Sequence, residues 1–201
     1  MKVLYLYFGS ASPVSRYEKK LIDQLNREVN GLHIDFFDWT GSLGLTINPG
    51  LNWALRNKSF LAPHYENLLK KTEAYDVVYI AQTETILPEV MKAIKPFVIY
   101  NTADDPESSE HCSFPFLMSA DMIVHAGINY NETTLMGEEF IKRGAKKTYF
   151  MPIGFYEEMF PAIQNIEQQF YKRDIPLVFV GFPKPNKLIP FARAFGKNLH
   201  I

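Results

Sequence analysis

The 201-residue sequence contains a single cysteine, Cys112, so no disulfide can form within the chain. One lone thiol fits a reducing compartment, and we interpret Cys112 as a small packed residue rather than as a nucleophile. We therefore expect a cytoplasmic protein.

Long hydrophobic runs are also missing. The apolar residues 1–8 are too few to form a signal-peptide core or a membrane span, and no small-residue cleavage site follows them. We interpret them as the first strand of the fold and expect no membrane span.

Neither sign of charge is in excess, because 21 Lys and Arg residues are balanced by 22 Asp and Glu residues, for a net charge of −1. These residues are scattered, so the chain lacks the basic stripe that nucleic-acid binding requires. We expect no nucleic-acid partner.

Glycine is sparse in the loop that follows the first strand. This loop, residues 9–15, has one glycine, so it is not a dinucleotide fingerprint, and no Gly-Lys-Ser/Thr follows to make a P-loop. It leads into a helix predicted at 16–28, with Ser15 as a candidate N-cap. Backbone N–H groups of Gly9 and Ser10 are candidate phosphate contacts there, and an ordinary turn is the alternative.

What the chain does contain is an alternation of strand and helix patterns. Strands are predicted at 1–8, 32–39, 76–82, 97–100, 120–127 and 147–152. Helices are predicted at 16–28, 64–74, 87–94, 110–119 and 129–144. Such an alternation predicts an α/β fold with a doubly wound, mainly parallel sheet.

Two adjacent carboxylates, Asp104 and Asp105, follow the apolar strand at 97–100. Pro106 keeps Asp105 out of the helical region, so both acids lie in a turn at the carboxyl end of the strand, where open parallel sheets bind ligands. We predict an acid or base role for Asp104 or Asp105, with helix capping as the alternative. His125, at the end of a later strand, is the second choice for a base, and a satisfied near-core histidine is its alternative.

The same edge of the sheet is predicted to carry further polar residues. Gln82 ends the strand at 76–82, and Asn101 and Thr102 follow the strand at 97–100. Together with Gly9, Asp104 and His125, they are predicted to line a substrate cleft.

The pattern changes near residue 165. After a polar run, a strand is predicted at 175–181 and a helix at 187–198. One strand and one helix cannot bury their own apolar surface, so we expect a first domain at 1–165 and, at 166–201, a linker and the first β-α unit of an incomplete second domain. Exposed apolar residues there would suggest a homodimer: Phe179, Phe182, Phe191 and Phe195.

Four segments together resemble the two-domain GT-B glycosyltransferases, most closely the spore-maturation CgeB-like branch. They are the Gly9 loop, Tyr100 to Pro106, Phe150 to Pro161, and Leu177 to Gly181. The resemblance extends along the whole chain in order and spacing. Its most specific parts are the Asp-Asp-Pro turn and the Pro-x-Gly…Phe-Pro segment.

The resemblance implies transfer of a sugar from a nucleotide-diphosphate donor to an acceptor. Residues 1–165 would form the Rossmann-like acceptor-side domain, and residues 166–201 would begin the donor-binding domain. Gly9, Ser10, Gly154 and Gly181 would contact substrate, no metal or other cofactor is implied, and the 201-residue chain alone is expected to be inactive. The alternative is a non-catalytic Rossmann-like or flavodoxin-like binding module.

Overall fold

The computed structural model of the chain describes residues 1–7, 13–39, 58–81, 86–102, 109–152, 177–178 and 199–200. The chain divides into two compact units, Met1–Gly154 and Phe155–Ile201, where the sequence suggested a boundary at 165. In the second unit, β7 (Leu177–Val178) and β8 (Leu199–His200) pair in parallel. The helix predicted at 187–198 lies outside the described residues.

The first unit is built on a six-stranded sheet in which every pairing is parallel. Its strands, in chain order, are β1 (Lys2–Tyr7), β2 (His33–Asp38), β3 (Val77–Ala81), β4 (Phe97–Thr102), β5 (Met122–His125) and β6 (Thr148–Phe150). Their order across the sheet is β2-β1-β3-β4-β5-β6. This order contains the 2-1-3-4-5 arrangement of flavodoxin-like folds, whose switch point lies between β1 and β3.

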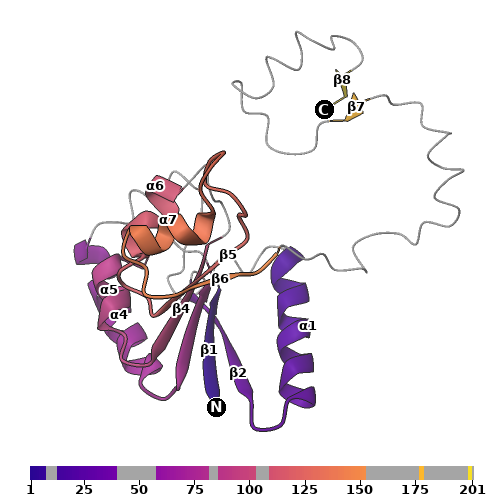
Figure 1. Ribbon diagram of the computed structural model, residues 1–201. Helices are drawn as coiled ribbons and strands as arrows, with labels where there is room; N and C mark the ends of the chain where they lie inside the picture. The colour runs from indigo at the N-terminus through magenta and orange to yellow at the C-terminus, as the bar shows by residue number, and fades with distance from the viewer. Residues whose placement is uncertain are drawn as a thin grey trace, which may run out of the picture. The chain divides into compact units, whose positions relative to one another are not determined.

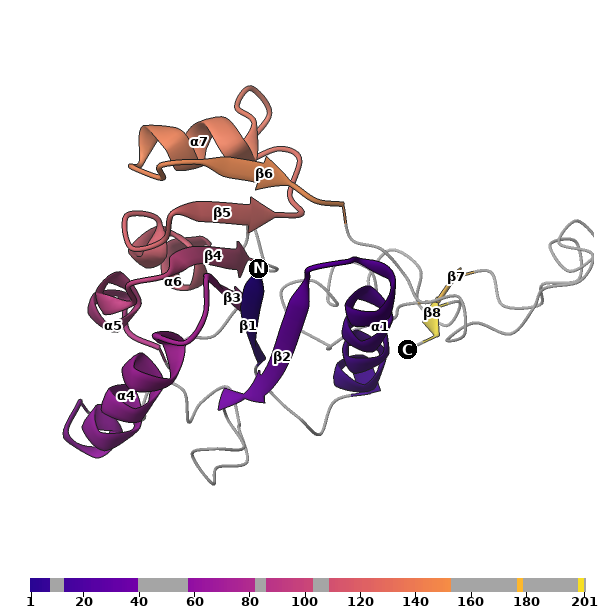
Figure 2. The same ribbon diagram turned by 90° about the horizontal axis from the view of Figure 1, so that it is seen from below.

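Helices flank both faces of this sheet, which confirms the predicted doubly wound α/β fold class. The helices of this unit are α1 (Pro13–Glu28), α4 (Lys58–Thr72), α5 (Pro88–Ala93), α6 (Ser109–Cys112) and α7 (Met136–Lys142), with a 3-10 helix at Phe114–Phe116. Helix α1 lies on one side of the sheet, and α4, α5, α6 and α7 lie on the other (Figures 1 and 2). Right-handed crossovers produce this division, because the chain moves one way across the sheet from β1 to β2 and the opposite way from β2 onward.

The main core lies between the sheet and the four later helices. Strand β4 shows the reason, since Val98, Tyr100 and Thr102 are buried while the residues between them are not. Successive side chains of a strand point to opposite faces, so one face of each strand enters this core. The core cluster joins strand residues such as Ile80 to Met91 of α5 and Phe140 of α7.

The helix predicted at 129–144 is shorter than expected, because α7 begins only at Met136. Asn131 holds a turn in the residues before α7. Its side-chain Oδ1 accepts hydrogen bonds from the backbone N–H groups of Thr133 and Thr134, at 3.0 and 2.9 Å. This local turn competes with helical hydrogen bonding. Gly144 follows the helix with φ +102, the left-handed conformation in which glycine commonly ends a helix.

Two other helices differ from the prediction at their ends. Helix α1 starts at Pro13, so Ser15 lies inside the helix and is not its N-cap. Proline suits the first turn because its missing N–H would have no helical partner there. The helix predicted at 110–119 is split into α6 and the 3-10 helix, which contains Pro115, a residue that cannot continue an α-helical hydrogen-bond ladder.

Candidate functional site

The carboxyl ends of β1, β3, β4 and β5 meet at one edge of the sheet, since these four strands are neighbours and parallel. This is the edge where ligands bind in open α/β sheets. Of the residues predicted for the site, the structure describes Asn101, Thr102 and His125. The others lie outside the described residues: Gly9, Ser10, Gln82, Asp104, Asp105, Gly154 and Gly181.

Asn101 and Thr102 point to opposite faces of the sheet, as successive residues of β4. Thr102 shares its register position with His125 and is only 1% exposed; its hydroxyl donates a hydrogen bond to the carbonyl of Val124 at 3.3 Å. Asn101 lies on the α1 face, where its side chain hydrogen-bonds with Tyr79. The structure therefore brings Thr102 beside His125 and separates Asn101 from them.

His125 is the last residue of β5, and its ring is held from several sides. The ring meets Phe140 edge-on, with centroids 5.5 Å apart, and lies 5.9 Å from the ring of Phe150. Its Nδ1 lies 2.9 Å from the carbonyl oxygen of Gly127. A carbonyl only accepts, so Nδ1 must carry the proton, and in the neutral ring Nε2 then has a free lone pair.

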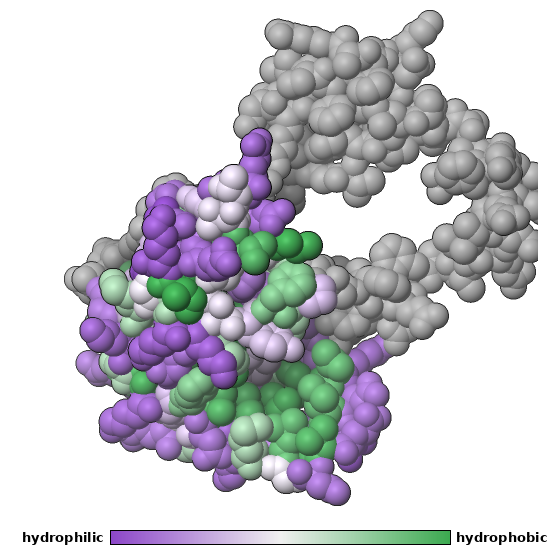
Figure 3. Space-filling model, viewed as in Figure 1, coloured by the Kyte–Doolittle hydropathy of each residue, from purple (hydrophilic) through white to green (hydrophobic). Residues whose placement is uncertain are grey.

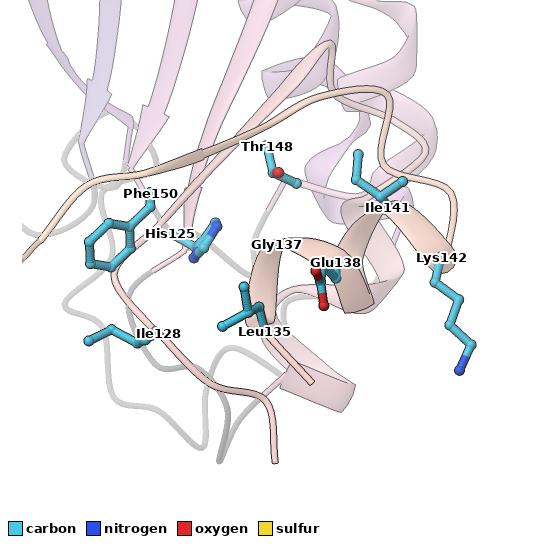
Figure 4. A pocket seen from close by; sticks show the side chains of 9 residues that line it. All are labelled: His125, Ile128, Leu135, Gly137, Glu138, Ile141, Lys142, Thr148 and Phe150. Carbon is cyan, nitrogen blue, oxygen red and sulfur yellow. The ribbon is translucent and has the colours of Figure 1, made fainter. Parts of the chain in front are cut away.

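A cavity of about 700 Å³ opens beside this ring, between α7 and the ends of β5 and β6 (Figure 4). Its volume is within the range typical of small-molecule sites. Its lining combines the polar atoms of His125 and Thr148 with mostly apolar walls. The full lining is His125, Ile128, Leu135, Gly137, Glu138, Ile141, Lys142, Thr148 and Phe150.

Gly137 of α7 lies against the polar end of the cavity, which is formed by His125 Nε2 and Thr148 Oγ1. A β-carbon at this position would lie 3.1 Å from Thr148 Oγ1 and 3.2 Å from His125 Nε2, so any larger side chain would press on both atoms. Both atoms thus flank the same point of α7. Among the described residues, no protein group forms a hydrogen bond with either atom.

A second polar cluster lies on the α1 face, next to the switch point between β1 and β3. The Tyr5 hydroxyl donates a hydrogen bond to Glu18 Oε1 at 3.0 Å, and the Tyr5 and Tyr79 rings stack with centroids 4.9 Å apart. Glu18 Oε2 is buried without a hydrogen-bond partner, and burial raises the pKa of Glu18 despite the bond from Tyr5. Burial, with the Glu18 charge adding to it, raises the pKa of Tyr79 to about 12.

Sequence reasoning found His125 but missed Gly137, Thr148 and the Tyr5–Glu18 pair. Gly137 had a weak signal, because a glycine in a helical stretch is costly and usually has a packing or functional reason. Thr148 is at the start of a strand and Tyr5 is in the middle of one, and neither position differs in pattern from a structural residue. Thr148 lies near Gly137 of α7, and Tyr5 lies near Glu18 of α1, only because the strands pair in this register.

The described part of the chain holds no group of three or more His, Cys, Asp or Glu side chains placed to bind a metal ion. None of its helices has the length and hydrophobicity needed to cross a bilayer.

No protein-family model matches the chain, and no curated protein does either. The fold class therefore rests on the sheet and its helices. Because a doubly wound sheet hosts many unrelated activities, function must be argued from the site.

Proposed function

We propose that this chain is the acceptor-side portion of a GT-B type glycosyltransferase, which moves a sugar from a nucleotide-diphosphate donor to an acceptor hydroxyl. The observation that carries the proposal is His125, at the carboxyl end of β5, whose Nε2 lone pair borders a cavity of about 700 Å³. A general base needs this combination of a free lone pair, a fixed ring and room for a substrate. The resemblance of the sequence to CgeB-like enzymes supports the same activity.

In the proposed reaction, the acceptor oxygen forms a bond to the anomeric carbon of the donor sugar. The bond from that carbon to the diphosphate oxygen breaks, and the nucleoside diphosphate leaves with the electron pair. The acceptor proton passes to Nε2 of His125. The resulting imidazolium keeps its Nδ1 hydrogen bond to the Gly127 carbonyl.

The donor would be bound by segments that lie outside the described residues. By the sequence resemblance, Gly9 and Ser10 would donate backbone N–H groups to the diphosphate, Gly154 would contact substrate from the segment that joins the two domains, and Gly181 from the loop after the first strand of the second domain. Backbone donors of this kind stabilise the charge that develops on a leaving phosphate. Asp104 and Asp105, the first choice from the sequence, lie outside the described residues and are the alternative bases.

The test is release of nucleoside diphosphate by the full-length protein, meaning the two-domain transferase of which this chain is proposed to be a portion. The protein is incubated with a panel of nucleotide sugars. We expect the His125→Asn variant to lower kcat about 10²- to 10⁴-fold, the usual contribution of a general base. Asparagine can still donate to the Gly127 carbonyl while lacking an atom at the Nε2 position. The matched control is Lys147→Gln, an exposed residue beside Thr148, which should leave kcat unchanged.

Calorimetry provides the result that would contradict the transferase proposal. If the full-length protein binds neither a nucleotide sugar nor a nucleoside diphosphate at millimolar concentration, the transferase proposal is wrong. If turnover occurs but survives His125→Asn and is lost in Asp104→Asn or Asp105→Asn, then the base is one of the two carboxylates.

A non-catalytic binding module is the second candidate, and the strand order favours it. The β2-β1-β3-β4-β5 order is that of flavodoxin-like folds, which bind ligands at the β1/β3 switch point without the second domain of a transferase. For a module of this kind, Asp104→Asn and Asp105→Asn would lower stability through loss of a helix cap and would leave any turnover of the full-length protein unchanged.

A further inference from the structure

The cavity beside His125 has one polar end and apolar walls. Its polar end is formed by His125 Nε2 and Thr148 Oγ1, which approach each other across Gly137. Its walls carry Ile128, Leu135, Ile141 and Phe150, which are 64%, 49%, 48% and 44% exposed. Four large apolar side chains left open to water around one hollow favour a ligand that covers them.

The charged residues of the lining do not point to an ionic ligand. Lys142 is 79% exposed, and its Nζ lies 3.9 Å from Glu139 Oε2. Figure 4 shows its ammonium group extending away from the side chains that surround the cavity. The opposite charge of Glu138 also lies in the lining. The two charges balance, so the recognition chemistry is left to the neutral polar end.

The two polar atoms are complementary to one hydroxyl group. Nε2 accepts a hydrogen bond, because Nδ1 holds the ring proton for Gly127. The hydroxyl of Thr148 both donates and accepts. A ligand hydroxyl can therefore donate to Nε2 and accept from Thr148, while the hydrocarbon that bears it lies against the apolar walls.

We propose that this cavity binds a neutral, largely apolar molecule that carries a hydroxyl group, such as a phenol or a fatty or terpenoid alcohol, with the hydroxyl between His125 and Thr148. If the chain acts as proposed above, this molecule is the sugar acceptor, and on that point alone the inference rests on the proposed function. A sugar or a peptide acceptor is disfavoured because its many polar groups would find few partners on these walls.

Binding of three probes by the full-length protein, measured by titration calorimetry, tests the inference. The probes are naphthol, its methyl ether and naphthalenesulfonate, which share one ring system and differ in the polar group. We expect naphthol to bind at least about tenfold more tightly than the ether, which cannot donate to Nε2, as the loss of one buried hydrogen bond implies. The sulfonate should bind more weakly than naphthol.

Variants of the polar end test whether the preference for naphthol over its ether arises there. His125→Asn keeps a donor for the Gly127 carbonyl but lacks Nε2, so the preference for naphthol should fall to about twofold or less. His125→Gln retains a polar atom at the ε position and should restore part of it. Gly137→Ala should weaken both naphthol and the ether, because its methyl group enters the polar end. Thr148→Val provides the same test if a histidine variant fails to fold, and Lys147→Gln is the control.

The inference would be overturned by equal affinity for naphthol and its ether, by tightest binding of the sulfonate, or by an unchanged preference in His125→Asn. Absence of probe binding together with dimerisation that Ile128→Asp abolishes, seen by light scattering, would assign the surface to a second copy of the chain and also overturn it. Naphthol binding as expected without sugar transfer to it would leave the inference intact and count against the proposed function. Sugar transfer to other acceptors without naphthol binding would support the proposed function and overturn the inference.

Discussion

The two faces of the central sheet differ sharply in burial. On the face covered by α4, α5, α6 and α7, the strand residues are fully buried: Leu4, Val78, Ile80, Tyr100 and Ile123 are each 0% exposed. On the α1 face, their neighbours in the same strands are only half-buried, among them Val3, Tyr5, Val77, Tyr79 and Ile99. Phe97 on this second face is 44% exposed.

The difference shows where the stability of this unit resides. In Figure 3 the largest group of green atoms lies over the sheet beside α1, so a band of apolar surface stays open there. Aromatic rings with polar tips occupy much of this face, and Lys19 lies over the Phe36 ring at 4.7 Å. A closed core on one face fixes the strand register, while the half-open face tolerates hydroxyls and a carboxylate such as those of Tyr5 and Glu18.

Two isoleucines, one on each face, give the largest expected effect. Ile80→Ala removes a fully buried side chain from the closed face and should lower the free energy of unfolding by about 2–5 kcal/mol. Ile99→Ala makes the same change on the half-buried α1 face and should cost less than half as much. Chemical denaturation with urea measures both. Equal losses would mean that the α1 face is as well buried in solution as the other.

The next effect concerns a hydroxyl on the closed face. Tyr100 is fully buried and donates a hydrogen bond to the carbonyl of Cys112 at 2.6 Å. Tyr100→Phe removes this buried hydrogen bond and should cost about 1–3 kcal/mol. Tyr149→Phe, at a residue that is 58% exposed, is the control and should change the unfolding free energy by less than about 0.5 kcal/mol. A cost at Tyr100 no greater than at Tyr149 contradicts the proposed contribution of this bond.

The smallest effect is a dependence on pH from the α1 face. Burial raises the pKa of Glu18, so folding favours its protonated form. The resulting stability is complete below the ordinary glutamate pKa of 4.5 and is lost as pH rises through the raised value. Glu18→Gln, which never ionises, should therefore gain in Tm relative to the unmodified protein as pH increases from 4 to 7. The gain at pH 7 is expected to be small, because the residue is only partly buried.

The matched control for this prediction is Glu66→Gln, at an exposed position of α4. Its effect on Tm should be small, because an exposed carboxylate contributes little to stability. If the Tm gain of Glu18→Gln does not grow with pH, the burial of this carboxyl in solution is less complete than in the structure.

Strong periodic signals in the sequence predicted the fold well. The strand pattern at 97–100 became β4, and the pattern at 76–82 became β3, because β-branched and aromatic runs between turn residues favour strands. The prediction was wrong where a side chain competed with the backbone, as at Asn131 before α7. Patterns of hydrophobicity carry no information about such local hydrogen bonds.

For the candidate site, the sequence identified one residue that the structure places beside a cavity. His125 was identifiable because it ends an apolar strand, and the end of a strand is set by local pattern. Its partners Gly137 and Thr148 come from a later helix and strand, and their proximity depends on crossover direction and register. The roles predicted for Asp104, Asp105, Gly9 and Gln82 remain predictions, since these residues lie outside the described part of the chain.

By itself, the sequence determined the alternation of strands and helices, and with it the parallel, doubly wound sheet, because short-range periodicity decides which element each segment forms. Only the tertiary structure decided the strand order, the unequal burial of the two faces, and the cavity at His125. The physical reason is that these features arise from contacts between residues far apart in the chain. A one-residue shift of β6 against β5 would move Thr148 and Phe150 to the other face and remove the cavity wall.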